Sequence, residues 1–255
     1  MISLTESQLM AWLTPILWPF LRVLAVFTAA PIFSSRAFPV RARIALALLI
    51  AFAAQPSLPN QPLINLNGPE AWGAVIQQVG IGLAIGFVVR LVFASFELAG
   101  EVVGFQMGLN FASFFDPSMN AQSSAAARFF GYMASLLFVV LNGHLLVLMV
   151  VIRSFEAFPV NQNFLEALSL MKLYSLGGEL FASGFWIALP IVGMLMFANL
   201  ALGIVSRVAP QMNIYSVGFP ITLAVGLVGM TVTLPMLDRP FLALMERAVD
   251  IFTGR

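Results

Sequence analysis

The sequence predicts an all-α, polytopic membrane protein of about six apolar helices, several of them interrupted by proline or glycine. Two observations lead to this fold class. Of the 255 residues, 60% are hydrophobic and only 9% are charged, whereas roughly a quarter of the residues in a soluble domain are charged. The apolar residues also gather in runs of the length that a membrane-spanning helix needs, about 20 residues.

Five runs have this length. They cover residues 9–33, 75–96, 129–152, 180–205 and 214–237. A sixth run, 44–54, reaches only about half of a ~30 Å hydrocarbon core at ~1.5 Å per residue. Four prolines lie in the following segment 55–69, so no helix is expected to continue through it. The sixth run is therefore expected to be a half-span, a re-entrant piece or a helix lodged against other protein.

Prolines also fall inside the long runs, at Pro15, Pro19 and Pro190. In an apolar setting they are tolerated where neighbours satisfy the freed backbone groups, so we expect these helices to be bent or broken. No segment outside the runs is long enough to fold by itself. We therefore expect residues 1–255 to form a single membrane domain.

The composition argues against several classes of function. The net charge of +1 predicts no nucleic-acid partner. Without cysteine and with His144 as the one histidine, we expect no metal site and no cofactor. The catalytic motifs G-x-S-x-G, H-E-x-x-H and the P-loop are missing from the sequence, so no enzyme is expected. A lone histidine in an apolar run is interpreted as a hydrogen-bonded packing residue.

A stripe of charged residues begins near the end of the run 75–96 and continues beyond it. Arg90, Glu97 and Glu101 are spaced by seven and by four, so they share one face of a continued helix. Charges at membrane depth face a bundle interior, a cavity or a partner. With Gln106 they are predicted to form a buried polar joint. A proton or ion relay remains the alternative.

Glycine recurs at every fourth position along the same segment, at Gly100, Gly104 and Gly108. Small residues four apart allow helix backbones to approach closely. The ladder predicts close packing, either within the chain or against another subunit.

The loop 111–120 combines apolar and small polar residues. The Asp116-Pro117 pair stops a helix, and irregular backbone at membrane depth is tolerated only beside protein or a water-lined cavity. Methionine and phenylalanine provide a deformable apolar contact. The pattern therefore favours a seal, or gasket, that yields to a passing chain, with an ordinary connecting loop as the alternative. Its sealing side chains would be Phe111, Phe114, Phe115 and Met119.

The last two runs are joined by the polar segment 206–220. Pro210 and Pro220 are expected to bracket the turn within it. It is interpreted either as an exposed loop or as an interface or entrance loop. The residues that would carry this role are Arg207, Pro210, Gln211 and Asn213.

Four motifs resemble those of a known family. They read APIFSSRAFPVRARIALAL at 30–48, GFQMGLNFASFFDP at 104–117, NGHLLVL at 142–148 and RVAPQMNIYSVGFP at 207–220. In order and spacing they resemble the FliR family, membrane subunits of the bacterial flagellar type III protein export gate. The resemblance extends over nearly the whole chain. The equivalent subunits of virulence injectisomes share much of this pattern, and the residues at 105–108 and 142–144 favour the flagellar form.

The resemblance implies a structural, pore-forming subunit that passes unfolded flagellar proteins across the inner membrane during flagellum assembly. Such subunits assemble with several copies each of FliP and FliQ into a helical pore within the flagellar basal body, with FlhB and FlhA as neighbours and lipid around it. Residues 1–175 would be FliP-like, with a plug loop at about 105–124. Residues 180–255 would be a FliQ-like hairpin and tail, with 207–213 on the cytoplasmic side. The alternatives are the injectisome subunit and, on the broken helices and charged stripe, a secondary transporter.

Overall fold

The computed structural model describes residues 6–59, 62, 64, 68–109, 123–161, 169, 176–211 and 213–253. Throughout this part of the chain the regular elements are helices, which confirms the predicted fold class. Five of them are long and apolar enough to cross a membrane, or up to six if one bent pair counts as a single span.

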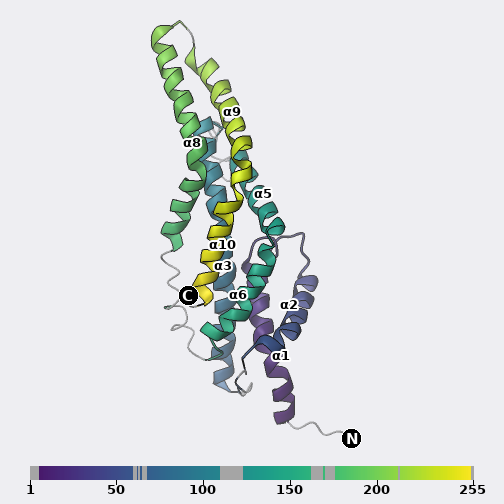
Figure 1. The fold of residues 1–255 in the computed structure, drawn as a ribbon. Coiled ribbons are helices and arrows are strands. Elements are labelled where there is room, and N and C mark those ends of the chain that lie inside the picture. Colours follow the sequence, from purple (N-terminus) through teal and green to yellow (C-terminus); the bar gives the residue numbers. More distant parts are fainter. Residues whose placement is uncertain are drawn as a thin grey trace. The chain divides into compact units, whose positions relative to one another are not determined.

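The elements follow one another along the chain as Figure 1 shows. They are α1 (Glu6–Ala29), α2 (Val40–Ala54), the short helix η1 (Gln55–Ser57), α3 (Pro69–Met107), α5 (Ala125–Val140), α6 (Gly143–Ala157), α8 (Leu176–Val208), α9 (Ile214–Thr233), η4 (Leu234–Met236) and α10 (Asp238–Thr253).

Helix α3 is much longer than the apolar run that predicted it. It begins at Pro69, where the missing N–H costs no helical hydrogen bond. It ends at Met107 because Gly108 takes φ +80°, a left-handed conformation that only glycine adopts readily. The charged stripe and most of the glycine ladder therefore lie on a helix.

The prediction of one continuous spanning helix over 129–152 was wrong. The chain breaks after Leu141 into α5 and α6, which together form the bent pair. Asn142 at the break has φ 56° and ψ 32°, a left-handed conformation that asparagine tolerates better than most residues. His144 consequently lies in the first turn of α6 and not in the middle of a long helix.

Prolines mark fewer boundaries than expected. Helix α1 continues through Pro15 and Pro19, and α8 continues through Pro190. Pro220 lies inside α9 and does not close the turn after Pro210, so that expectation was wrong. The short sixth run, 44–54, is also part of a longer helix, because α2 begins at Val40, directly after Pro39.

The chain divides into two compact units. Unit 1 comprises Met1–Leu91, Asn142–Gly177 and Met245–Arg255, and unit 2 comprises Val92–Leu141 and Gly178–Leu244. Helix α3 thus contributes its first part to unit 1 and its second part to unit 2. This division does not test the expected FliP-like and FliQ-like parts, which remain a prediction.

In unit 1, α1 lies beside α2 and against the first part of α3 (Figure 1). Glycines allow this second approach, because a Cβ built at Gly86 would lie 2.6 Å from the Cβ of Ala29. Trp18 and Phe27 of α1 and Phe155 of α6 are buried in the core.

In unit 2, phenylalanines from three helices form the core. The ring of Phe93 lies 5.6 Å from that of Phe138 and 6.2 Å from that of Phe241, and Phe96 lies 5.7 Å from Phe241. Helices α8 and α9 run side by side (Figure 1), and Gly229 of α9 faces Ile191 of α8. The phenylalanine cluster thus joins α3, α5 and α10, and the Gly229–Ile191 contact joins α9 to α8.

Candidate functional site

The candidate site lies in unit 2, where α3 ends and α5 begins. The end of α3 closes in a regular way, with the N–H of Gly108 donating to the carbonyl of Phe105 (3.1 Å) and that of Leu109 donating to Gly104 (3.0 Å). Residues 110–122, between this end and α5, lie outside the described part of the chain. The described residues therefore define the two anchors of that segment.

The first anchor joins the end of α3 to the start of α5. The side chain of Glu101 accepts a hydrogen bond from the backbone N–H of Ser124 through Oε1 (2.9 Å). Ser124 is the N-cap of α5, and its Oγ accepts from the N–H of Ala127 (3.0 Å). A carboxylate oxygen is a strong acceptor for a helix N-terminal N–H, so Glu101 fixes the position at which the chain re-enters α5.

Glycine allows the two backbones to meet at this anchor. A Cβ built at Gly100 would lie 2.5 Å from Cα of Ala127 and 2.6 Å from the carbonyl oxygen of Ala126. One built at Gly104 would lie 3.0 Å from the Ser124 hydroxyl oxygen. Gly100 and Gly104 therefore pack within this chain, against α5.

The second anchor joins the end of α3 to α9. Met107 is fully buried, and its carbonyl accepts a hydrogen bond from the Thr222 hydroxyl (3.3 Å). Gly226 provides the space for the methionine, because a Cβ there would lie 2.5 Å from the Met107 Cγ. A Cβ at Gly108 would lie 3.3 Å from the ring of Phe219. The last turn of α3 is thus held on two sides.

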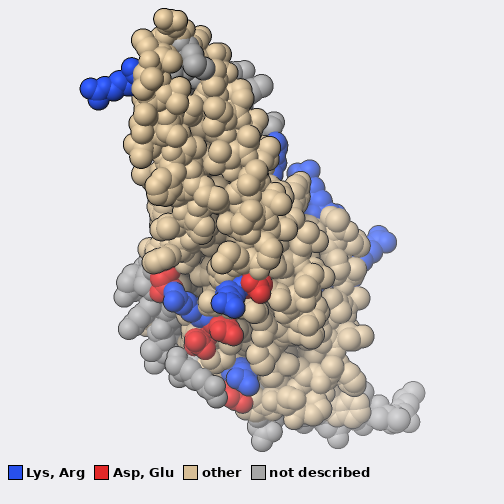
Figure 2. Space-filling model, turned by 45° about the horizontal axis from the view of Figure 1, so that its top comes forward, with Lys and Arg blue, Asp and Glu red and all other residues tan. Residues whose placement is uncertain are grey.

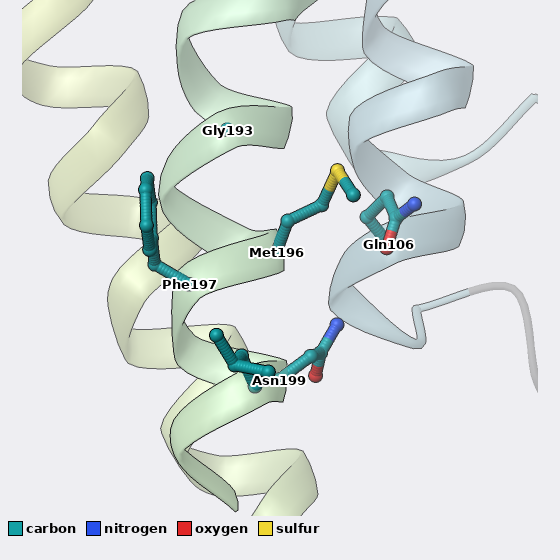
Figure 3. A pocket seen from close by; sticks show the side chains of 6 residues that line it. Gln106, Gly193, Met196, Phe197 and Asn199 are labelled. Carbon is teal, nitrogen blue, oxygen red and sulfur yellow. The ribbon is translucent and has the colours of Figure 1, made fainter. Parts of the chain in front are cut away.

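A pocket of about 620 Å³ opens beside the same turn. In Figure 3, Gln106 of α3 and Met196 of α8 point toward one another, and Asn199 lies on the adjacent turn of α8. The wall is mostly apolar, with Gln106 and Asn199 as its amide groups. Such a lining can hold an apolar side chain and hydrogen-bond a backbone beside it, but it provides no acid, base or nucleophile. It is completed by Gly193, Phe197 and Leu200.

The predicted polar joint is only partly visible. Glu101 makes the contact described above, and Gln106 lines the pocket. The side chains of Arg90 and Glu97 are exposed, and the stem of Glu97 lies over Gly131 of α5, 3.3 Å from a Cβ built there. A joint that includes Arg90 and Glu97 stays a prediction, as does a relay through them.

The predicted sealing residues and the predicted interface residues remain to be placed. The sealing residues lie outside the described part of the chain: Phe111, Phe114, Phe115 and Met119. The turn after α8 is described at Arg207, Pro210, Gln211 and Asn213, all of which are exposed. Arg207 lies in the last turn of α8, where a positive charge is favourable. Their role at an interface stays a prediction.

The sequence analysis missed a buried polar network in unit 1. Arg22 of α1 is 0% exposed. Its Nε donates to Gln78 Oε1 (2.8 Å), one terminal nitrogen donates to Ser154 Oγ (2.9 Å) and the other to the carbonyl of Phe158 (2.9 Å). The guanidinium carbon also lies 3.6 Å from the ring centroid of Phe155. The available signal was the one charge within the run 9–33.

The network continues through Gln77, next to Gln78. Gln78 Nε2 donates to Gln77 Oε1 (2.8 Å), which also accepts from the N–H of Asn161 (2.9 Å). Gln77 Nε2 donates to the carbonyl of Pro159 (3.1 Å). Together with Arg22, these bonds hold the chain as it leaves α6. Among the described residues no group of His, Cys, Asp and Glu is arranged to hold a metal ion.

Comparison with known proteins agrees with the resemblance seen in the sequence. The family of bacterial export proteins, family 1, matches residues 13–248. The flagellar biosynthetic protein FliR of Escherichia coli (strain K12) is 39% identical over 237 residues, which cover 93% of this chain and 90% of the relative. That of Pectobacterium carotovorum subsp. carotovorum is 38% identical, covering 99% and 98%. That of Bacillus subtilis (strain 168) is 29% identical, covering 86% and 85%.

Proposed function

Because the chain belongs to the bacterial export proteins, family 1, as a FliR-type membrane subunit of the flagellar export apparatus, we propose that it helps to form the pore of that apparatus. Unfolded flagellar proteins would pass through this pore across the inner membrane, in the flagellar basal body. The proposed role is structural, because the anchors hold helices together and the pocket can hold apolar side chains.

The observation that carries the proposal is the pair of anchors around residues 110–122. The Glu101–Ser124 hydrogen bond and the contact of Gly100 with Ala127 bring the two ends of this segment to one joint. The second anchor at Met107 fixes that joint on α9. A segment with a fixed base and apolar side chains suits a seal that must return to one place after each substrate has passed. We therefore assign the plug to 111–120.

The partners of this pore would be several copies of FliP and FliQ, with FlhB and FlhA adjacent. Large apolar side chains are exposed along α8, among them Trp186 and Phe197 at 74% and 76%. Broad areas of the face in Figure 2 carry no charged side chain. Apolar surface of this extent needs a cover, which a membrane protein finds in lipid or in sister subunits. From the resemblance in the sequence, we propose that residues 180–255 form the FliQ-like part and residues 1–175 the FliP-like part.

The plug assignment is tested by deleting residues 111–120 in the intact export complex. We expect the complex to assemble, because both anchors remain, and the membrane to become leaky to small ions. The leak is measured as sodium or proton flux into vesicles that contain the purified complex. Replacing Phe111, Phe114, Phe115 and Met119 by serine should produce the same leak.

The matched control replaces the same four residues by leucine, which keeps the apolar volume and should keep the seal. An assembled complex that stays tight after the deletion would show that the plug lies elsewhere. A chain that purifies by itself as a stable monomer, without sister subunits, would contradict the pore-subunit role itself.

A further inference from the structure

The start of α2 carries a concentration of positive charge without any acid nearby in the sequence. Arg36, Arg41 and Arg43 lie within eight residues, and no Asp or Glu occurs between positions 7 and 69. Arg36 and Arg41 are exposed, and Arg43 is half-buried. Arg43 donates a long hydrogen bond to the carbonyl of Phe38 (3.4 Å), and its buried Nε has no hydrogen-bond partner among the described residues. This basic segment, Arg36, Arg41 and Arg43, therefore has no acidic neighbour within its own stretch of the sequence.

The N-terminus of α2 adds its own partial positive charge to that of the arginines. Arg41 lies in the first turn of α2 and Arg43 directly after it, and the first turn carries no acid. The N-cap is Pro39, whose side chain cannot accept a hydrogen bond, so the first N–H groups have no side-chain cap. The helix dipole is positive at this end, which disfavours arginine and favours an anion. An external anion would pair with the arginine side chains and accept hydrogen bonds from the uncapped N–H groups.

An exposed apolar stripe continues directly from Arg41. Ile44, Leu48, Leu49 and Phe52 follow it at helical spacing on the same face. All four are exposed, from 43% for Ile44 to 66% for Phe52, and only 17% of the candidate span Val40–Ser57 is buried. A positive group at one end and a long apolar face below it complement an anionic phospholipid, with its charged headgroup and acyl chains.

The turn that leads into α2 is firmly built. Ile32 has φ 69°, a left-handed conformation that is an outlier for a β-branched residue. The ring of the next residue, Phe33, lies 4.6 Å from that of Phe27 and 6.3 Å from that of Phe38. Strain of this kind persists where the surroundings hold it, often where a ligand needs a fixed shape. The position of the basic segment is thus set before any ligand arrives.

We propose that Arg36, Arg41 and Arg43 bind the phosphate headgroup of an anionic phospholipid, whose acyl chains lie along Ile44, Leu48 and Phe52 of α2. Arg41 is the central contact, because it alone shares the apolar face. Free phosphate offers the same charge but nothing for that face, and a protein partner would need an acidic group placed beside an apolar helix face. The lipid matches both parts in a protein that is embedded in a membrane. This site does not depend on the plug.

The test uses the whole export complex, purified in detergent, stripped of lipid and titrated with fluorescent dioleoyl phosphatidylglycerol or phosphatidylcholine. The variants are R36Q/R41Q/R43Q, the charge-preserving R36K/R41K/R43K, and the control R128Q/R153Q/R247Q, which removes three exposed arginines elsewhere. Each lost charge should weaken phosphatidylglycerol binding about fivefold, so the triple glutamine variant should lose on the order of a hundredfold. The lysine variant and the control should bind as the unmodified complex does.

Four results would overturn the assignment. Equal phosphatidylglycerol binding by the triple glutamine variant, or an equal loss in the control, would remove the site from this segment. Displacement of the lipid by millimolar inorganic phosphate would indicate a free-anion site. A photo-crosslinker at position 36 that captures an acidic protein segment instead of lipid would place a subunit there. Preferential crosslinking of phosphatidylglycerol over phosphatidylcholine at that position would support the proposal.

Discussion

The two units use the same helix, α3, in opposite ways. In unit 1 its glycines pack on α1, and Gln78 joins a network around Arg22 in which each polar group is satisfied inside the chain. In unit 2 its glycines pack on α5, but its polar groups are partly exposed and its last turn lies beside an open pocket. Substitutions in unit 1 should therefore affect folding, and those in unit 2 should affect sealing and assembly.

The largest effect is expected at Arg22. Replacing it by methionine keeps much of the apolar stem but removes three buried hydrogen bonds, each worth roughly 1 kcal/mol net. We expect Arg22→Met to lower the free energy of unfolding by about 3 kcal/mol, because Gln78 and Ser154 lose their partner. The measurement is denaturant unfolding of the chain in detergent, followed by the temperature limit of motility.

The matched control is Arg128→Met, which removes an exposed arginine of unit 2 and should change stability by less than about 0.5 kcal/mol. Equal stability of Arg22→Met and the unmodified chain would show that the network is not what holds unit 1 together. Arg22→Lys retains the charge but cannot reach three partners at once. Its free energy of unfolding should therefore lie between those of Arg22→Met and the unmodified chain.

The second effect compares glycines. Gly100→Ala places a methyl group against the backbone of α5, which cannot move aside, and should cost about 1–3 kcal/mol. Gly86→Ala should cost a similar amount in unit 1, where the methyl group would meet Ala29 and Ala30. Only Gly100→Ala should also increase ion leak, because it displaces the first anchor. Both are measured by unfolding and by ion flux into vesicles.

Two further glycines calibrate this comparison. At Gly226 the contact is the flexible side chain of Met107, so alanine should cost less than at Gly100. No described atom lies within 4 Å of a Cβ built at Gly203, where alanine should gain up to about 1 kcal/mol of helix stability. An equal leak from the Gly86 and Gly100 variants would remove the proposed distinction between the units.

The sequence predicts different parts of the molecule to different depths. Composition and apolar run length were enough for the fold class and for most of the helices. The break at Asn142 was invisible because NGH sits inside a continuous apolar run, and only the left-handed backbone reveals it. Prolines were a poor guide to helix boundaries, since Pro220 lies inside α9 and Pro19 does not interrupt α1.

The candidate site shows the same limit. The four-residue spacing predicted the close packing at Gly100 and Gly104, because that packing depends on one periodic face. The partners of Arg22 come from α3, α6 and the chain that follows α6, at sequence separations of 56, 132 and 136 residues. A single sequence carries no local signal for such long-range pairs, so the network had to be seen in three dimensions.

A smaller effect is expected at Glu101. Glutamine still offers an oxygen to the N–H of Ser124, but the bond loses its charge, so Glu101→Gln should cost about 1 kcal/mol. Glu97→Gln, at an exposed side chain, should cost less. Export should fall only as far as the amount of assembled complex falls. Loss of export at normal assembly would instead favour the proton or ion relay.

The smallest effect should come from Asn142→Gly, at the residue where the chain passes from unit 2 to unit 1. Its left-handed backbone suits glycine, so Asn142→Gly should change the free energy of unfolding by only about 0.5 kcal/mol. Asn142→Ala should cost about 1–2 kcal/mol, because alanine resists that conformation. Unfolding of both variants measures the difference. If alanine is tolerated as well as glycine, the break between α5 and α6 is not set by this residue.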